Sequence, residues 1–457
     1  QGDYVLTYRA QDRQGNEAQS VSRKVRVVDP VLPLVSLEGP DYVIHEVGTP
    51  FSDPGATAVD QEDAAVAVTV SGAVLTDTLG TYLLSYGAND GAGYEAIPVT
   101  RTVVVVDANF KLLSYYIDKG KVIITDCETT ASGDLVIPER IEGLPVTAIG
   151  TRAFSGCSNL VSILVPNGVK VINEYAFENC TKLVEVGLPL ELETLGHHAF
   201  NNCSKLLSVA LADSLVNLGE YAFQGCQSLE EVVLPTKLRS IPRGCFENCR
   251  SLVSITLPEG LTHIDENGFS NCHLLEGIQL PDSLLQLGRR AFSNCASLKV
   301  VELPENLTMI GYEWDSWVFE RCVSLTHVRI PNGVDVIGEG MFYGCRDLAE
   351  IKIGKGTRII GRNAFYGNAS LKDIELPEGL VEIREQAFGG QANDWLWEPW
   401  NNNDMGSPSD TRNQLERIVI PSTVSSIQDN AFSQSHRLLR VVMEGNAAGL
   451  GGENVFQ

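Results

Sequence analysis

The chain has 457 residues, with 58 acidic against 34 basic side chains and a formal net charge of −24. This charge excludes the basic footprint that nucleic-acid binding needs, and no apolar run is long enough to predict membrane insertion. The length allows several hydrophobic cores, while the acidic surface is expected mainly to be hydrated and permits cationic partners or Ca²⁺.

The first 107 residues contain an internal repeat with a period of 78 residues. Residues 2–29 align without gaps on residues 80–107, and the matched positions include Tyr4, Tyr8 and Arg23 with Tyr82, Tyr86 and Arg101. We therefore expect residues 30–107 to form one complete all-β domain. Residues 1–29 are expected to be the C-terminal part of an earlier copy, so that the chain is a piece of a longer protein.

Strand-like runs in this region are separated by Gly, Asp and Pro turns, a pattern typical of a small β-sandwich. The string Phe51-Ser-Asp-Pro-Gly-Ala-Thr-Ala-Val-Asp60, followed by Gly80-Thr-Tyr and Asp90-Gly, resembles bacterial Ig-like domains that occur in tandem on surface proteins. The resemblance implies that these domains act as a stalk.

From Phe154 onward one pattern recurs, and its anchor phenylalanine returns every 23 residues as far as Phe292. Each unit contains Leu-x-x-Ile-x-Leu-Pro, then Leu-x-x-Ile-Gly, then Ala-Phe-x-x-Cys. A fixed period of this length predicts a solenoid of stacked coils. The alternation in the first segment predicts a short strand that the proline ends, and the glycine permits the next turn.

This pattern resembles the BspA-like class of bacterial leucine-rich repeats, which occurs on cell-surface and secreted proteins. The resemblance implies an N-terminal cap at residues 108–150 and a solenoid at residues 151–457, with an extracellular or cell-surface location. The predicted fold class is therefore mainly β, an Ig-like β-sandwich followed by a leucine-rich-repeat solenoid with 23-residue coils.

Nine of the eleven cysteines occupy one position, three residues after the anchor phenylalanine. Coils stacked about 4.8 Å apart would place these thiols in an interior column, where cysteine packs as a small apolar residue. A line of single residues does not provide the tetrahedral cluster that a zinc site needs. We therefore expect structural thiols and no metal site, with disulfides between neighbours as the alternative.

Two insertions interrupt the period, near residues 312–317 and residues 391–412, and they contain all five tryptophans of the chain. Insertions in solenoids often form the binding face, and tryptophan rings provide large contact surfaces. The candidate ligand-binding residues are Tyr312, Trp314, Trp317, Trp395, Trp397 and Trp400. The alternative is that these rings fold back and close the loops. Oxygen-bearing residues between 394 and 404 leave a Ca²⁺ site as a further alternative, although their spacing matches no EF-hand loop.

The exposed positions of the predicted strands form a second candidate surface. Charge concentrates on them between residues 327 and 375, and the candidate partner surface consists of His327, Arg329, Glu350, Lys352, Asp373 and Glu375. The alternative is a face that is only hydrated.

No nucleophile, metal-protease or phosphate-loop motif appears, so the sequence predicts no enzyme. We expect adhesion, with the solenoid binding a protein or glycan ligand on another cell or matrix. The alternative is a self-associating structural subunit of an extracellular fibre or surface layer. Glycan binding as an accessory region of a larger enzyme is a third hypothesis, because the fold alone identifies no ligand.

Overall fold

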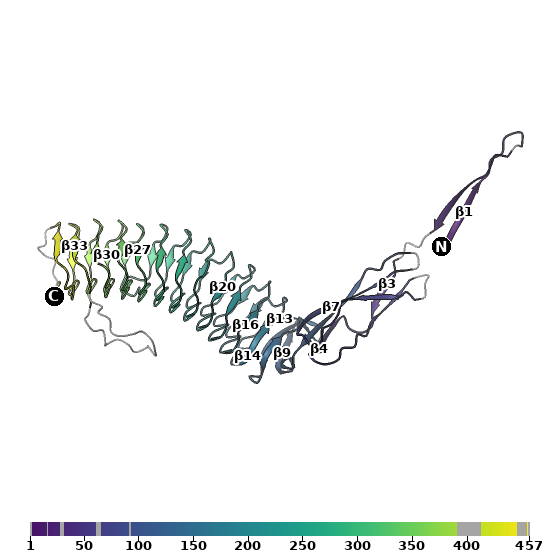
Figure 1. Cartoon of the computed structure of the whole chain (residues 1–457), viewed down its shortest axis with the longest axis horizontal. Helices are drawn as coiled ribbons and strands as arrows, with labels where there is room; N and C mark the ends of the chain where they lie inside the picture. Colours follow the sequence, from purple (N-terminus) through teal and green to yellow (C-terminus); the bar gives the residue numbers. More distant parts are fainter. Residues whose placement is uncertain are drawn as a thin grey trace. The chain divides into compact units, whose positions relative to one another are not determined.

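The computed structural model of the chain describes residues 2–15, 17–27, 32–60, 65–90, 93–390, 413–445 and 455. The chain forms two compact units, residues 1–108 and residues 109–457 (Figure 1). Strands make up nearly all of the regular structure in both units, which confirms the predicted fold class.

The first unit contains a hairpin and a β-sandwich. The hairpin consists of β1 (Gly2–Tyr8) and β2 (Val21–Val27). One sheet of the sandwich pairs β3 (Leu34–Leu37) with β5 (Ala56–Val59), and the other has the order β4 (Tyr42–Glu46), β8 (Val99–Val106), β7 (Gly80–Ala88) and β6 (Val68–Ser71). Residues from both sheets, including Val35, Ala58 and Tyr86, form its core, as expected for a sandwich.

The two copies of the 78-residue repeat have the same strand register. Tyr4 faces Val25 in the hairpin as Tyr82 faces Val103 in the sandwich. Leu6 likewise faces Arg23, and Leu84 faces Arg101. The aligned residues therefore form equivalent pairs of strands.

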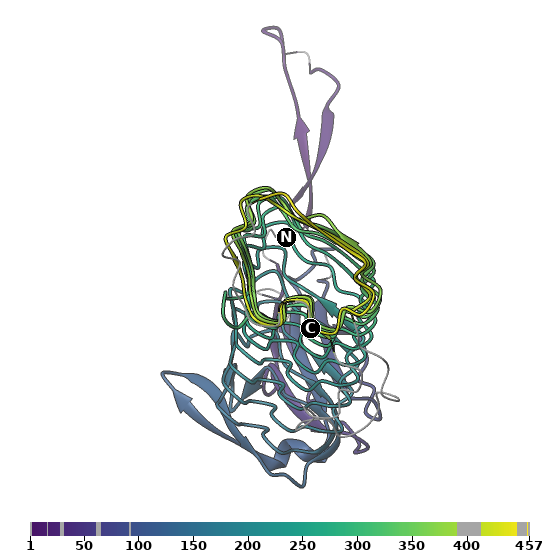
Figure 2. The same cartoon turned by 90° about the vertical axis from the view of Figure 1, so that its left-hand side faces the viewer.

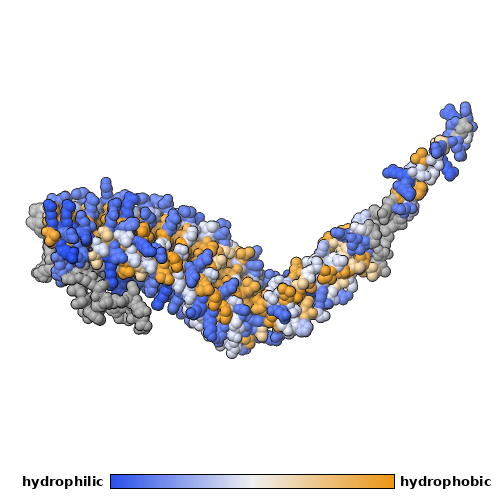
Figure 3. All heavy atoms as spheres, viewed as in Figure 1, coloured by the Kyte–Doolittle hydropathy of each residue, from blue (hydrophilic) through white to orange (hydrophobic). Residues whose placement is uncertain are grey.

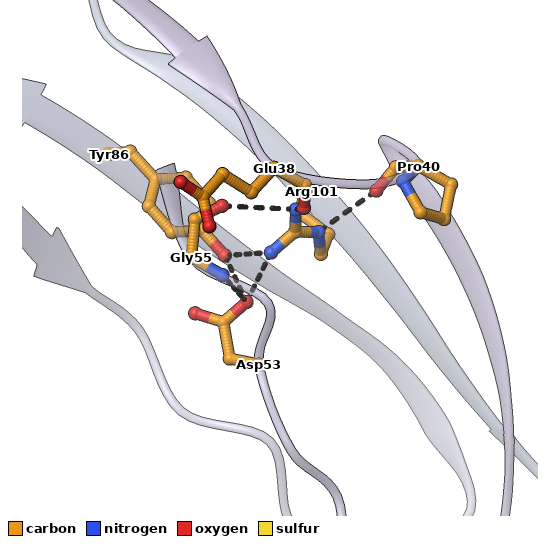
Figure 4. A network of polar contacts seen from close by, with 6 residues as sticks. All are labelled: Glu38, Pro40, Asp53, Gly55, Tyr86 and Arg101. Atoms are coloured by element: carbon orange, nitrogen blue, oxygen red, sulfur yellow. Dashed lines mark hydrogen bonds and ion pairs between the residues drawn. The ribbon is translucent and has the colours of Figure 1, made fainter. Parts of the chain in front are cut away.

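Arg101 is fully buried and links the two sheets of the sandwich (Figure 4). Its guanidinium forms an ion pair with Asp53 and donates to the Tyr86 hydroxyl at 2.8 Å and to the Pro40 carbonyl at 2.9 Å. The Tyr86 hydroxyl donates to Asp53 at 2.7 Å. Burial, together with the neighbouring Asp53 carboxylate, raises the pKa of Tyr86 to about 12. The phenol therefore remains a proton donor at physiological pH.

The second unit begins with a cap and continues as stacked coils. The cap comprises the 3-10 helix η1 (Ala108–Leu112), β9 (Leu113–Asp118), β10 (Lys121–Cys127), β11 (Ser132–Val136), β12 (Arg140–Ile141) and β13 (Leu144–Ile149). Figure 2 shows the later coils almost superimposed along the stack. Each contact therefore repeats one coil further along.

The coils contribute strands to two parallel layers. We call the first layer the strand face: β14 (Asn159–Leu164), β16 (Glu185–Gly187), β18 (Ser208–Ala210), β20 (Glu231–Val233), β23 (Gly277–Gln279), β25 (Val300–Glu302), β27 (His327–Arg329), β29 (Glu350–Lys352), β31 (Asp373–Ile374), β33 (Arg417–Ile420) and β35 (Arg440–Met443). Its central residues are buried and their neighbours face solvent in most strands, as the period of two predicted.

The opposite layer, which we call the second sheet, contains two-residue strands after β13. They are β15 (Val171–Ile172), β17 (Thr194–Leu195), β19 (Asn217–Leu218), β21 (Ser240–Ile241), β22 (His263–Ile264), β24 (Gln286–Leu287), β26 (Met309–Ile310), β28 (Val336–Ile337), β30 (Ile359–Ile360), β32 (Glu382–Ile383) and β34 (Ser426–Ile427). The hydrophobic core of the unit lies between the two layers.

Columns of identical residues fill this core. The anchor phenylalanines are buried, and consecutive rings stack with their centres 4.9 to 5.7 Å apart. All eleven cysteines are buried and free, and the thiol of Cys180 donates to the carbonyl of Phe154 at 3.1 Å. Where serine replaces cysteine, the Ser435 hydroxyl donates to Phe388 at 3.2 Å. The predicted interior thiol column is confirmed, and it joins each coil to the preceding one.

Candidate functional site

The first insertion forms a short loop between β26 and β27. Tyr312 and Asp315 form an antiparallel bridge across it. The side chains of Tyr312 and Trp314 are 54% and 67% exposed. Trp317 instead is only partly exposed, and its ring centre lies 5.6 Å from that of Tyr343. The loop thus presents two aromatic rings to solvent and folds one back.

The second insertion carries the other three predicted aromatic residues. Trp395, Trp397 and Trp400 lie outside the described residues, as do the oxygen-bearing residues considered for Ca²⁺. Over the described part of the chain, no group of three or more His, Cys, Asp or Glu side chains is placed to hold a metal ion.

Arg384 holds the exposed loop against the coils. Its guanidinium carbon lies 4.0 Å from the centre of the Trp314 ring, within the range of a cation–π contact. The same guanidinium forms ion pairs with Glu313 at 2.5 Å and with Glu382 at 3.2 Å. Arg384 is 5% exposed, so this contact fixes one face of a tryptophan whose remaining surface is open to solvent.

The position of Arg384 explains how it reaches the loop. It occupies the position that glycine has in the two preceding coils, at Gly338 and Gly361. A Cβ at Gly361 would lie 2.8 Å from the backbone of Gly338, and these two coils between the loop and Arg384 carry no side chain at this position. Sequence reasoning missed Arg384, although arginine in a glycine position is a visible departure from the repeat.

A second ion pair holds the other side of the loop. Asp315 lies 2.6 Å from Arg289, and Arg289 also pairs with Glu266 at 2.8 Å. The Glu339 backbone N–H donates to the Glu313 carbonyl at 3.0 Å. Contacts from three different coils therefore hold the loop in place.

The predicted charged surface lies on neighbouring strands of the strand face. His327 pairs with Glu350, and Arg329 with Lys352, in the parallel register of β27 and β29. The main chain of Lys352 also forms a parallel β-bridge with that of Glu375 in the next coil. All six predicted residues are exposed: His327, Arg329, Glu350, Lys352, Asp373 and Glu375. The structure brings them together as one patch, and their role in binding stays a prediction.

An aromatic column that sequence reasoning missed runs along one corner of the solenoid. Tyr175, His198 and Tyr221 stack with ring centres 4.8 Å apart at both steps, and Arg152 lies 4.4 Å from the Tyr175 ring. The three residues have φ between 54° and 58°, a left-handed conformation that bulky side chains rarely adopt. Burial lowers the pKa of His198, which favours a neutral ring in the stack.

The distribution of surface hydropathy differs along the second unit. Figure 3 shows apolar residues gathered over the coils around β14 to β20 and more hydrophilic residues toward the C-terminal coils. Exposed apolar side chains in the earlier coils include Leu164, Leu207 and Val233. No helix among the described residues is long and apolar enough to cross a bilayer.

Comparisons with known proteins identify both units. The family model "BspA type Leucine rich repeat region" matches residues 147–274, 216–314, 262–395 and 313–439. The model "Bacterial surface protein, Ig-like domain" matches residues 35–105. No curated protein matches the chain.

The solved structures that are similar to the chain include two bacterial leucine-rich repeat proteins. A leucine-rich repeat protein from Bacteroides ovatus is 28% identical, over 72% of this chain and 92% of that one, with a TM-score of 0.51. A leucine-rich cell-surface protein from Faecalibacterium prausnitzii is 26% identical, over 74% of this chain and 94% of that one, with a TM-score of 0.49.

Proposed function

This chain belongs to the family of BspA-type leucine-rich repeat proteins, and we propose that it is a bacterial surface adhesin whose solenoid binds a protein or glycan ligand. The match of its first unit to an Ig-like domain of bacterial surface proteins supports the surface location. In this proposal the Ig-like unit is the stalk and the coils present the contact surface. The proposed role is binding without catalysis.

The observation that carries the proposal is the fixed and exposed ring of Trp314. A tryptophan that is 67% exposed leaves a large apolar surface in water. Arg384 and the ion pairs of Glu313 and Asp315 already hold its loop, so binding costs little further conformational entropy. Rigid aromatic side chains of this kind are the commonest anchors in protein interfaces, and they also stack on sugar rings.

The charged patch on β27, β29 and β31 is the second contact surface in this proposal. Like charges lie side by side on neighbouring strands, as Arg329 and Lys352 do, whereas Lys352 lies 3.1 Å from Glu350 on the same strand. Exposed pairs of this kind contribute little to stability. In an interface, such charged side chains orient a partner of complementary charge.

Binding to arrays of purified glycans and of matrix proteins tests the proposal. The wild-type chain is compared with Trp314→Ala and with the control Leu190→Ala, which removes another exposed apolar side chain, 76% exposed, elsewhere on the coils. We expect Trp314→Ala to weaken binding by about tenfold or more and Leu190→Ala to leave it unchanged.

Equal binding by all three proteins would exclude the aromatic loop as the contact site. Sedimentation of the wild-type chain at rising concentration tests the alternative, a structural subunit that self-associates. Concentration-dependent growth into fibres or sheets, without binding on either array, would favour that alternative over adhesion.

A further inference from the structure

Asparagine directly precedes glycine at three places in the chain, at Asn167-Gly168, Asn267-Gly268 and Asn332-Gly333. In such a pair the backbone nitrogen of the glycine can attack the asparagine side chain, because glycine has no side chain to obstruct the approach and its backbone is the least restricted. The three pairs share the same two residues, but the structure places them in two different environments. The environment therefore determines which pair can react.

Two of the pairs occupy the same position of the repeat, in the turn that follows the strand face. In each turn the residue after the glycine donates to the proline carbonyl, as Val334 does to Pro331 at 3.2 Å. Both residues of Asn167-Gly168 and of Asn332-Gly333 are exposed. Neither glycine N–H has a hydrogen-bond partner among the described residues. Solvent can therefore reach these two nitrogens and remove their protons.

The third pair lies inside the hydrogen-bonded frame of the coils. Gly268 is buried, and its N–H donates to the Asp265 carbonyl at 3.1 Å. Asn267 has φ of 57°, and its own N–H donates to the Arg289 carbonyl at 2.9 Å. The Gly268 nitrogen cannot approach the Asn267 side chain without breaking its hydrogen bond. This pair is therefore an internal control with the same two residues.

A hydrogen bond activates each of the two exposed asparagines. The Asn332 Oδ1 accepts from the backbone N–H of Lys355 in the next coil at 3.0 Å. The Asn167 Oδ1 accepts from the backbone N–H of Leu190 at 3.3 Å. Attack on the side-chain carbon Cγ moves negative charge onto this oxygen, and a donor placed where charge develops stabilises the transition state. The shorter hydrogen bond makes Asn332 the more reactive of the two.

We propose that Asn332 and, more slowly, Asn167 are modification sites at which water converts the side-chain amide into a carboxylate. The Gly333 nitrogen, after losing its proton to solvent, attacks Cγ of Asn332. The Cγ–Nδ2 bond then breaks, and this nitrogen takes up a proton and leaves as ammonia. One water molecule opens the five-membered imide at either carbonyl, which gives aspartate or isoaspartate. The reaction consumes one water molecule and needs no oxidant or reductant.

The aspartate product fits the repeat. Asp213 has the equivalent position two coils after Asn167. Its carboxylate accepts from the backbone N–H of Thr236 at 2.8 Å and from the Thr236 hydroxyl at 3.0 Å. An aspartate in place of Asn332 can accept the Lys355 N–H in the same way. Isoaspartate instead adds one carbon to the main chain of the turn, so only this second product is expected to disturb the coil.

Conversion of Asn332 changes the charge beside the charged patch. Glu305, Asn332 and Lys355 have the same position in three successive coils. Glu305 also pairs with Arg329 of the patch at 2.6 Å. The reaction adds one negative charge between Glu305 and Lys355, and charges at the rim of an interface steer the approach of a partner. The modification itself does not depend on the binding function proposed for the patch.

Mass spectrometry of the full chain tests the proposal. The folded chain is incubated in mildly alkaline buffer and digested at intervals, and chromatography separates the aspartate and isoaspartate peptides. The same chain unfolded in urea is the reference, because its three pairs have no structure to distinguish them. In the folded chain we expect Asn332 to convert fastest, Asn167 more slowly and Asn267 to remain. In urea we expect similar rates at all three.

Lys355→Pro tests the activating hydrogen bond. Proline has no N–H to donate, and it suits the second position of a turn. We expect conversion of Asn332 to slow by about tenfold or more, while Asn167 in the same molecule converts at its usual rate. An unchanged Asn332 rate in this folded variant would overturn the role assigned to the hydrogen bond.

The comparison within the wild-type chain decides the proposal whether or not the proline variant folds. Conversion of Asn267 as rapid as that of Asn332 in the folded chain would overturn it. So would intact Asn332 and Asn167 after a time in which the unfolded chain has reacted.

Discussion

The guanidinium of Arg384 lies 4.0 Å from the ring centre of Trp314, across the coils that contain Gly338 and Gly361. This contact connects an inserted loop to a coil that is not its neighbour in the repeat. Arg384 also brings a buried positive charge to Glu313 and Glu382. The exposed aromatic surface of the protein therefore depends on a residue far from it in sequence.

Replacing Arg384 by methionine keeps much of the side-chain volume and removes the charge. We expect the free energy of unfolding to fall by about 2 kcal/mol, because a buried ion pair loses one partner, and hydrogen exchange in residues 312–316 to accelerate. Urea denaturation and exchange measurements test both effects. The control is Arg362→Met, since the Arg362 side chain is 52% exposed in its pair with Glu385 and such pairs contribute little. Equal effects of the two variants would contradict the anchoring role.

The thiol column makes the solenoid sensitive to alkali. Burial raises the pKa of Cys295 to about 12. Burial also raises the pKa values of Cys226 and Cys345. A thiol in the unfolded chain has a pKa of about 8.5. Above that pH the unfolded chain releases protons that the folded chain keeps. Stability is therefore full below about pH 8 and falls at higher pH, by up to about 1.4 kcal/mol per pH unit for each thiol.

Urea midpoints between pH 7 and pH 9.5 measure this loss. Cys295→Ser is the matched variant, because a serine at the same position in a later coil, Ser435, makes the equivalent hydrogen bond. We expect the urea midpoint of Cys295→Ser to fall less steeply with pH than that of the wild type, because one buried thiol no longer contributes to the loss. A midpoint that does not change with pH in the wild type would refute the prediction.

Arg101→Lys is expected to destabilise the sandwich by about 3 kcal/mol, because an ammonium cannot replace the planar set of guanidinium donors. The internal repeat provides the control, Arg23→Lys. Arg23 is the aligned residue, faces Leu6 as Arg101 faces Leu84, and is exposed. Hydrogen exchange in β7 and β8 of the full chain reports the difference. Similar protection in the two variants would show that burial of Arg101 is unimportant.

Gly340→Ala is expected to displace the ring of Trp317. Gly340 has φ of +60°, and a Cβ there would lie 2.2 Å from the Trp317 ring. The left-handed backbone alone costs alanine about 1–2 kcal/mol, and moving the ring adds to this. Gly277→Ala is the control, since no atom lies within 4 Å of a Cβ at Gly277. If urea midpoints shift equally in both variants, the predicted contact does not limit stability.

The repeat made much of the second unit predictable. The strand positions, the phenylalanine and cysteine columns and the exposure of His327 and Glu350 follow from their constant places in the 23-residue unit. Of the aromatic loop, the sequence indicated an insertion rich in tryptophan but not that Trp314 stays exposed while Trp317 packs inward. That division depends on Arg384 and Gly340, which lie in other coils.

The sequence by itself determined the solenoid, because in a stack of similar coils each residue meets its own counterpart one period away. A column such as Cys180 and Cys203 is therefore visible in the period alone. The tertiary structure decided what happens where the period is broken. Pro242 lies at an open groove beside β19 and β21, while the insertion after Gly311 forms a turn whose main chain contacts the next coil at Gly338 and Glu339. The physical reason is that a missing hydrogen bond between neighbouring coils leaves backbone groups exposed. Only the three-dimensional arrangement shows whether another segment contacts those groups.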